Sequence, residues 1–213
     1  RMSIKITTLV ENSVYGKGLQ GEHGLSLLVD TGEHRLLFDT GASDLFIRNA
    51  RILGIDLKEV DFLVLSHGHR DHTGGLHHFL AVNDKAQVVC KRELFQPKFK
   101  DERENGVMQP DALDSTRFRF VDEVTELCRG VFVFPQLPVT DEEDTHFEHF
   151  FTWAEGRKQA DTFTDELALV LKQDAEVSVL SACSHRGITN IIRAVQEYFP
   201  QTSLKLVLGG FHI

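Results

Sequence analysis

Residues 66–75 read SHGHRDHTGG and place four potential metal ligands close together, namely His67, His69, Asp71 and His72. Imidazole nitrogens suit Zn, Fe, Mn or Ni, and a carboxylate among them favours a hydrolytic centre over a closed, cysteine-rich structural site. The alternative is a polar turn with incidental histidines, but three His and one Asp in this fixed pattern, directly after the apolar run VDFLVLS, would rarely arise by chance. We therefore predict a centre for one or two divalent transition metal ions, with zinc favoured over Mn, Fe or Ni.

Two later histidines also follow apolar runs that have the length of strands. His185 lies in SACSHRGITN after the run VSVLSA, and His212 follows LVLGG. Strand ends are where a metal site could be completed, so we predict both as ligands. The alternatives are an ordinary, partly buried histidine at 185 and a histidine without a role at 212.

The stretch LLFDTGAS at 36–43 is also how the catalytic loop of an aspartic protease reads. Such a protease needs two equivalent Asp-Thr-Gly loops, whose aspartates share a proton. The other copy, VDTG at 29–32, lies nine residues away and cannot form a second lobe.

GKGLQG at 16–21 matches a dinucleotide-binding pattern, but a strand follows it instead of a helix. Neither motif is interpreted as an active site.

The elements that would position these residues are short strands alternating with helices. Residues 97–115 are polar and contain two prolines, which predicts a long excursion or lid. Residues 139–151, VTDEEDTHFEHFF, are interpreted as a solvated loop with an aromatic anchor. Strands are predicted at 3–9, 25–30, 34–38, 60–66, 86–90, 117–121, 130–134, 166–173, 175–183 and 204–210, and helices at 43–51, from about 74 onward, and at 188–198.

The overall composition predicts one globular domain over residues 1–213, since 41% hydrophobic and 26% charged residues are near globular averages. The net charge of -9 disfavours nucleic acid as a partner, and no apolar run is long enough to span a membrane. No signal peptide pattern begins the chain, and the odd, scattered Cys90, Cys128 and Cys183 do not suggest a disulfide framework. A cytoplasmic location is expected.

The motif HxHxDH after a strand, FDTG before it and a later strand-end histidine together resemble the metallo-β-lactamase-fold hydrolases. The segments EHGLSLLVDTG, LLFDTGAS, LSHGHRDHTGGL, DELALVL, SACSHRGITNII and LVLGGFH are similar to one branch of that superfamily. This branch is that of the dihydropterin-methyl-ribofuranosylaminobenzene-phosphate synthase-like proteins of tetrahydromethanopterin biosynthesis. The resemblance implies an α/β fold, a four-layer αββα sandwich with its metal ions at the sheet edge.

The resemblance also implies roles for individual residues. His67, His69 and His185 would hold one metal ion, and Asp71 and His72 would bind a second, with His212 as a further ligand. Asp71 would also take or deliver the proton during catalysis. Asp39 would support the ligands from behind, and His23 of the EHG segment would face the substrate.

The implied function is hydrolysis, by hydroxide generated at the metal, of a small phosphate ester, cyclic phosphate or other ester. A pterin- or ribosyl-phosphate compound fits the branch, and the oligomeric state stays open. Two departures favour an alternative, a non-catalytic metal-binding sensor or partner module with a degraded pocket. FPQLPVTDEED at 134–144 lacks the arginine that the branch has there, and the branch continues past GGFH for a further helix and strand.

Overall fold

The computed structural model describes residues 3–212 and divides into two compact units. Unit 1 runs up to Cys90 and also includes Gly106–Arg119, whereas unit 2 comprises Lys91–Asn105 and the chain from Phe120 onward. Each unit is described by itself. A single domain over residues 1–213 stays a prediction.

Unit 1 is built on a mixed sheet with the strand order β1-β2-β3-β4-β5-β8. The pairs β1–β2 and β2–β3 are antiparallel, and β3–β4 and β4–β5 are parallel. Because β3 and β4 run in the same direction, the residues that follow them emerge at one edge of the sheet. The bounds are β1 Lys5–Val10, β2 Ser26–Asp30, β3 Arg35–Phe38, β4 Phe62–Val64, β5 Gln87–Cys90 and β8 Phe118–Phe120.

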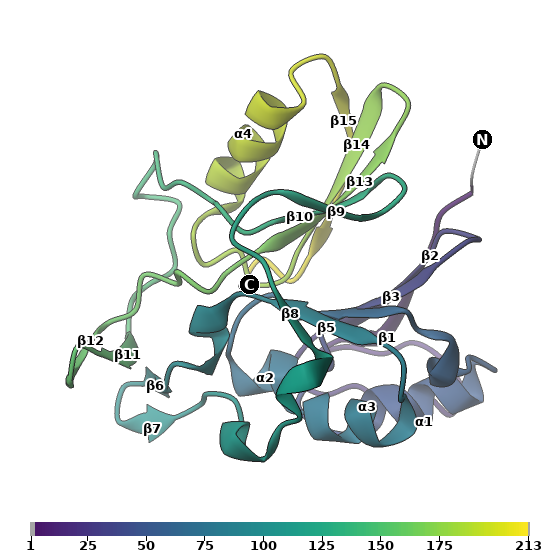
Figure 1. Cartoon of the computed structure of the whole chain (residues 1–213), viewed down its shortest axis with the longest axis horizontal. Coiled ribbons are helices and arrows are strands. Elements are labelled where there is room, and N and C mark those ends of the chain that lie inside the picture. The colour runs from purple at the N-terminus through teal and green to yellow at the C-terminus, as the bar shows by residue number, and fades with distance from the viewer. Residues whose placement is uncertain (1–2, 213) are drawn as a thin grey trace. The chain divides into compact units, whose positions relative to one another are not determined.

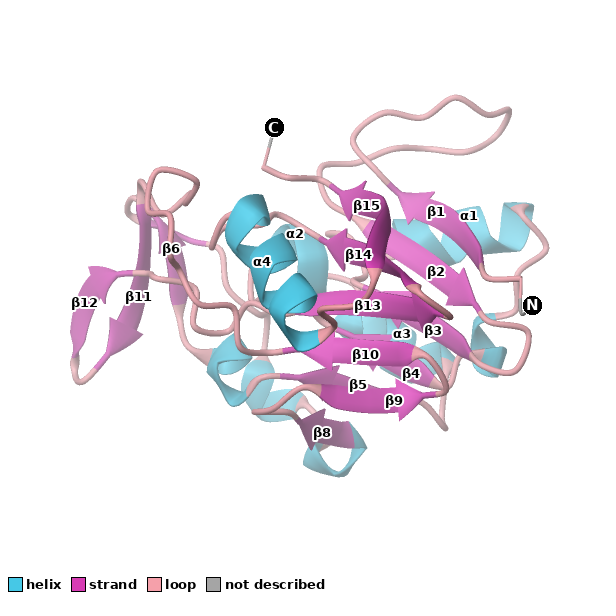
Figure 2. Ribbon diagram, turned by 90° about the horizontal axis from the view of Figure 1, so that it is seen from above, coloured by secondary structure: helices cyan, strands magenta, loops and turns pink. Residues whose placement is uncertain are grey.

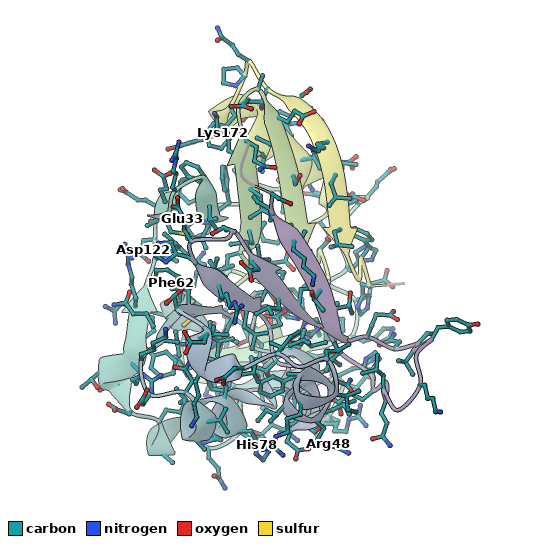
Figure 3. The ribbon with its side chains drawn as sticks, turned by 90° about the vertical axis from the view of Figure 1, so that its right-hand side faces the viewer. Glu33, Arg48, Phe62, His78, Asp122 and Lys172 are labelled. Carbon is teal, nitrogen blue, oxygen red and sulfur yellow. The ribbon has the colours of Figure 1, made fainter. Side chains whose placement is uncertain are left out.

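Three helices cover one face of this sheet (Figure 1): α1 (Leu45–Ile52), α2 (Arg70–Thr73) and α3 (Leu76–Val82). Phe46 of α1 and Phe79 of α3 are fully buried. The opposite sides of the same helices carry exposed side chains, including Arg48 and His78 (Figure 3). The alternation of apolar and polar residues at helical spacing therefore sets which side of α1 and α3 faces the sheet.

Unit 2 contains a second mixed sheet with the order β15-β14-β13-β10-β9. Helix α4 (Ile188–Tyr198) lies along this sheet (Figure 2), and its Ile191 and Val195 pack into a core with Val170 and Val179. The predicted helix at 188–198 is thus confirmed. The strand bounds are β9 Thr125–Cys128, β10 Val131–Phe134, β13 Ala168–Gln173, β14 Glu176–Ser181 and β15 Ser203–Gly209.

A smaller sheet, β12-β11-β6-β7, also belongs to unit 2 and was not predicted. Its strands β6 (Lys98–Lys100) and β7 (Arg103–Glu104) lie inside the segment interpreted as irregular. β6 pairs with β11 (Phe150–Ala154), which pairs in turn with β12 (Arg157–Ala160). Runs as short as KFK and RE carry too little periodicity to predict a strand, and the pairing of β6 with the distant β11 is not visible in the local sequence. Short 3₁₀ turns occupy Leu57–Glu59, Arg92–Phe95, Pro110–Ala112 and Ser115–Arg117.

Across residues 3–212, we find no helix with the length and apolar character needed to cross a membrane.

Candidate metal centre

The first group of predicted ligands lies where β3 and β4 end in unit 1. Asp39 directly follows β3, and its backbone N–H donates to the Val64 carbonyl of β4 at 2.9 Å. Ser66 and His67 follow β4 after one further residue. Parallel pairing therefore brings an aspartate and a histidine that are distant in sequence to the same edge of the sheet.

The Asp39 carboxylate is fully buried and accepts three hydrogen bonds. Its Oδ1 accepts from the Ser66 backbone N–H at 2.7 Å, and its Oδ2 accepts from the Ser66 hydroxyl at 2.6 Å and from His72 Nδ1 at 2.7 Å. An ionised carboxylate only accepts hydrogen bonds, so the His72 proton must be on Nδ1. The Nε2 atom of a neutral His72 then carries the lone pair that a metal ion needs.

The same reasoning assigns the tautomer of His67. Its Nδ1 lies 2.8 Å from the Ser66 hydroxyl oxygen. Because that hydroxyl gives its single hydrogen to Asp39, it must accept from Nδ1–H of His67. Asp39 thus orients His72 directly and His67 through Ser66, and these hydrogen bonds leave the imidazole lone pair of each histidine on Nε2.

Three buried imidazoles lie together at this edge. The His67 ring centroid is 4.7 Å from that of His69 and 4.5 Å from that of His72. The exposed fractions of the three residues are 0%, 4% and 3% in chain order. One possible ligand atom each from Asp39, His67 and His72 falls within a mutual distance of 4.8 Å. Closely spaced, buried imidazoles, of which His67 and His72 have Nδ1 in a hydrogen bond, fit a divalent transition metal ion.

Asp71 adds a carboxylate beside these rings. Its Oδ2 lies 3.3 Å from His72 Nε2 and 3.4 Å from His23 Nε2. Burial raises the pKa of the Asp71 carboxyl, but the positive charges that His72 and the neighbouring imidazoles carry when protonated outweigh burial and hold that pKa below its usual range. The His23 side chain is 82% exposed, so it borders solvent on the far side of Asp71.

The Glu22–Gly24 turn holds this edge together. Glu22 Oε1 accepts from the backbone N–H groups of Ala42 and Ser43, at 2.9 and 3.1 Å, and Oε2 accepts from the Ser43 hydroxyl. A Cβ on Gly24 would lie 2.2 Å from the Asp71 carbonyl oxygen, so only glycine permits that close approach. The EHG segment therefore contacts both the loop after Asp39 and helix α2, which carries Asp71 and His72.

His185 is the predicted ligand that lies in unit 2. It is fully buried, and its Nδ1 lies 2.9 Å from the His146 carbonyl oxygen. A carbonyl only accepts, so Nδ1 of His185 carries the proton and Nε2 the lone pair. The buried Glu166 accepts from the backbone N–H groups of His185 and Arg186, at 2.8 and 2.9 Å. Burial raises the pKa of Glu166 to about 7, against the opposing effect of these two hydrogen bonds.

Further aromatic rings surround His185 within unit 2. The Phe163 ring is stacked on His185, with centroids 3.8 Å apart and planes 10° apart. His212 is exposed, and its ring lies 4.7 Å from His185 and 5.5 Å from His146. Unit 2 therefore brings the two predicted histidines, His185 and His212, next to each other.

The structure groups the predicted residues by unit. The sequence reasoning missed several residues that contact them. Two of these residues had a sequence signal: Ser66 ends a predicted strand, and His146 is one of two histidines in EDTHFEHFF. Nothing in the local sequence singles out Glu166 as a partner of His185. Unit 1 brings together His23, Asp39, His67, His69, Asp71 and His72, and unit 2 brings together His185 and His212; the missed residues are Glu22, Ser66, His146, Phe163 and Glu166.

The sequence profile of the metallo-β-lactamase superfamily matches residues 19–165. The chain belongs to this superfamily. A crystal structure of a metal-dependent hydrolase of the β-lactamase superfamily is 35% identical and superposes with a TM-score of 0.83, covering 99% of this chain and 77% of the other. The predicted metallo-β-lactamase fold of α/β class is confirmed by this superfamily match and structural similarity.

The branch resemblance is confirmed as well. The 7,8-dihydropterin-6-methyl-4-(β-D-ribofuranosyl)-aminobenzene-5'-phosphate synthase of Methanocaldococcus jannaschii is 28% identical, over 99% of this chain and 78% of its own length. An uncharacterized protein of the same organism is 29% identical over 98% and 79%. A quorum-quenching N-acyl homoserine lactone lactonase, 14% identical with a TM-score of 0.53 over 87% of this chain and 79% of its own, shares the fold alone.

Proposed function

We propose that the protein is a metal-dependent enzyme that hydrolyses a small phosphate ester, a cyclic phosphate or a related ester. The observation that carries the proposal is the buried Asp39 carboxylate, which orients His72 directly and His67 through Ser66. A merely structural histidine cluster does not need its Nε2 atoms aligned by a shared carboxylate, whereas a metal centre does.

The ligand assignment follows superfamily membership together with the tautomers derived above. A divalent metal ion supplies Lewis acidity and lowers the pKa of the water it binds. Zinc is favoured because imidazole nitrogens dominate the donor set, and Mn, Fe and Ni are the other candidates. We assign His67, His69 and His185 to one metal ion and Asp71, His72 and His212 to a second.

The chain's own side chains would handle proton transfer and substrate binding. Asp71 takes up or delivers a proton at Oδ2; its side chain is 23% exposed, and two imidazoles flank this oxygen. His23 reaches into solvent next to it and would contact an anionic group of the substrate. The name of the synthase relative includes a ribofuranosyl phosphate, so we propose a pterin- or ribosyl-phosphate compound as the substrate class.

Metal analysis combined with hydrolysis of bis(p-nitrophenyl) phosphate tests this function. We expect one to two equivalents of transition metal and a hydrolysis rate that chelation abolishes and metal restores. His67→Ala should lose both, and His78→Ala, which removes an exposed histidine on α3, should lose neither (Figure 3). Stoichiometric metal without turnover of phosphodiesters, cyclic phosphates or carboxylic esters would favour the sensor or partner module instead.

A further inference from the structure

A lysine is fully buried in unit 2. Lys98 of β6 has a side chain that is 1% exposed, and its Nζ lies 2.7 Å from Asp161 Oδ2 and 2.8 Å from Asp165 Oδ1. Burial lowers the pKa of Lys98, but the charges of Asp165 and Asp161 outweigh burial and raise that pKa above its ordinary value. Lys98 is therefore a buried cation. Burying a charge is costly, and pairing two carboxylates with it is the arrangement that makes the cost tolerable.

The two carboxylates flank a residue with an unusual backbone. Phe163 has a φ of 54°, in the left-handed region that bulky side chains rarely adopt. Its N–H donates to Asp161 Oδ1 at 2.7 Å, and its ring is fully buried with Lys98 Nζ 5.1 Å from the centroid. The Lys98 ion pairs thus fix the segment that forces Phe163 into this conformation.

Phe163 and Glu166 connect this segment to His185. The Phe163 ring is stacked on the His185 imidazole at a centroid distance of 3.8 Å. The Phe163 carbonyl accepts from the Glu166 backbone N–H at 3.1 Å, and the Glu166 carboxylate accepts from the His185 backbone N–H. Residues 161–166 therefore contact His185 at both its ring and its backbone, and strained conformations of this kind are characteristic of functional sites.

We propose that Lys98 is a positioning residue for His185: its ammonium group holds Asp161 and Asp165 so that Phe163 stacks on the imidazole and directs Nε2. The effect on metal binding rests on the proposed function, whereas the effect on the ring does not. The segment 97–115, interpreted from sequence as a long excursion or lid, then has a role in unit 2 because its strand β6 carries the cation.

The ring itself can be observed without any metal. A stacked phenyl ring shifts the proton signals of the imidazole upfield in an NMR spectrum. In the metal-free protein we expect upfield His185 ring signals, assigned by their absence from His185→Gln. Lys98→Met should move these signals toward the values of an unstacked histidine. The matched control is Leu171→Ala, which destabilises the core of the same unit through a buried side chain of β13 and should leave the signals in place.

Metal affinity, measured by competition with a chelator, provides the second readout. Lys98→Met should weaken binding about 10- to 100-fold, as loss of a group supporting a ligand typically does, and Leu171→Ala should not. A folded Lys98→Met protein with wild-type His185 signals overturns the proposal. Shifted signals with wild-type metal affinity support the positioning role of Lys98 and overturn instead the assignment of His185 as a ligand.

Lys98→Met leaves two carboxylates facing each other without a cation, so it could fail to fold. The neutral variant Lys98→Met/Asp161→Asn/Asp165→Asn removes that repulsion and keeps an amide oxygen for the Phe163 N–H. The same two measurements then decide in the same way. Wild-type His185 ring signals in the folded neutral variant would overturn the proposal, and shifted signals would support it.

Discussion

Asp39→Asn is the substitution that most directly tests how the unit 1 ligands are oriented. The amide oxygen can replace Oδ1 and accept from the Ser66 N–H, which places the amide nitrogen where Oδ2 accepted from the Ser66 hydroxyl and from His72 Nδ1. An amide nitrogen only donates. His72 must then accept at Nδ1, which moves its proton to Nε2 and blocks that atom as a metal ligand. Flipping the amide instead would place its nitrogen against the Ser66 N–H.

The magnitude follows from the hydrogen bond that is lost. A hydrogen bond to a charged group contributes about 1.5–3 kcal/mol, and each 1.4 kcal/mol is a factor of ten in affinity. In the variant, metal binding requires His72 to return to its Nδ1-protonated tautomer without this hydrogen bond. That free-energy cost should weaken metal binding roughly 10- to 150-fold. The fold should persist, because the substitution preserves shape and one of the acceptor atoms.

Two measurements check this expectation. Titration of the metal-free protein with Zn²⁺ against a competing chelator gives the affinity, and long-range ¹H–¹⁵N correlation spectra give the tautomer of His72. Asp30→Asn is the control, since Asp30 lies in the same sheet but accepts from Gly32 and Arg35 rather than from an imidazole. Unchanged affinity together with an Nδ1-protonated His72 in Asp39→Asn would refute the orienting role of the carboxylate.

Three further outcomes are expected. His67→Ala and His69→Ala should each remove most of the bound metal in elemental analysis, because no neighbour replaces the lost nitrogen; full metal content in the double variant would contradict the ligand assignment. Titration with a chelator should strip the metal in two steps, and His212→Ala should abolish the weaker one, since His212 is exposed and weakly enclosed; a single step unaffected by this change would exclude His212. Burial raises the pKa of Asp61, but the Arg35 N–H and the Lys85 ammonium group outweigh burial and lower that pKa. The ionised Asp61 therefore stabilises the fold at pH values above its unfolded-state pKa, and this contribution is lost as the pH falls through its folded-state pKa. Chemical denaturation should therefore show Asp61→Asn to be about 1 kcal/mol less stable at neutral pH, with a gap from wild type that closes below about pH 4; a gap that does not depend on pH would exclude this linkage.

Sequence reasoning succeeded where one element carries its own signal. Helix α4 was predicted at its observed bounds because Ile191 and Val195 recur at helical spacing and face the sheet. The strands β3 and β4 are compact apolar runs that are buried on both faces, so their existence was also predictable. The HxHxDH cluster was visible for a similar reason, since its members lie next to each other along the chain.

The parts that could not be predicted depend on pairing between distant segments. Strand β6 reads KFK; it pairs with β7 on one side and with the distant β11 on the other, and its Lys98 is buried. An isolated lysine in a charged segment is ordinarily a solvated residue. Likewise, Glu166 and the His146 carbonyl meet His185 only after the loops of unit 2 have folded. Local composition contains no information about such contacts.

The three histidines with an assigned tautomer differ in the group that accepts from Nδ1, and this difference has a chemical consequence. His72 donates to a carboxylate, His67 to a hydroxyl that is itself bonded to that carboxylate, and His185 to a neutral backbone carbonyl. A negative acceptor increases the basicity of the opposite nitrogen more than a neutral one does. Nε2 of His72 should accordingly be the most electron-donating of these three nitrogens and that of His185 the least. His185 also has the Phe163 ring stacked on its face. The orientation proposed for unit 2 therefore depends on packing, whereas in unit 1 it depends on the Asp39 carboxylate.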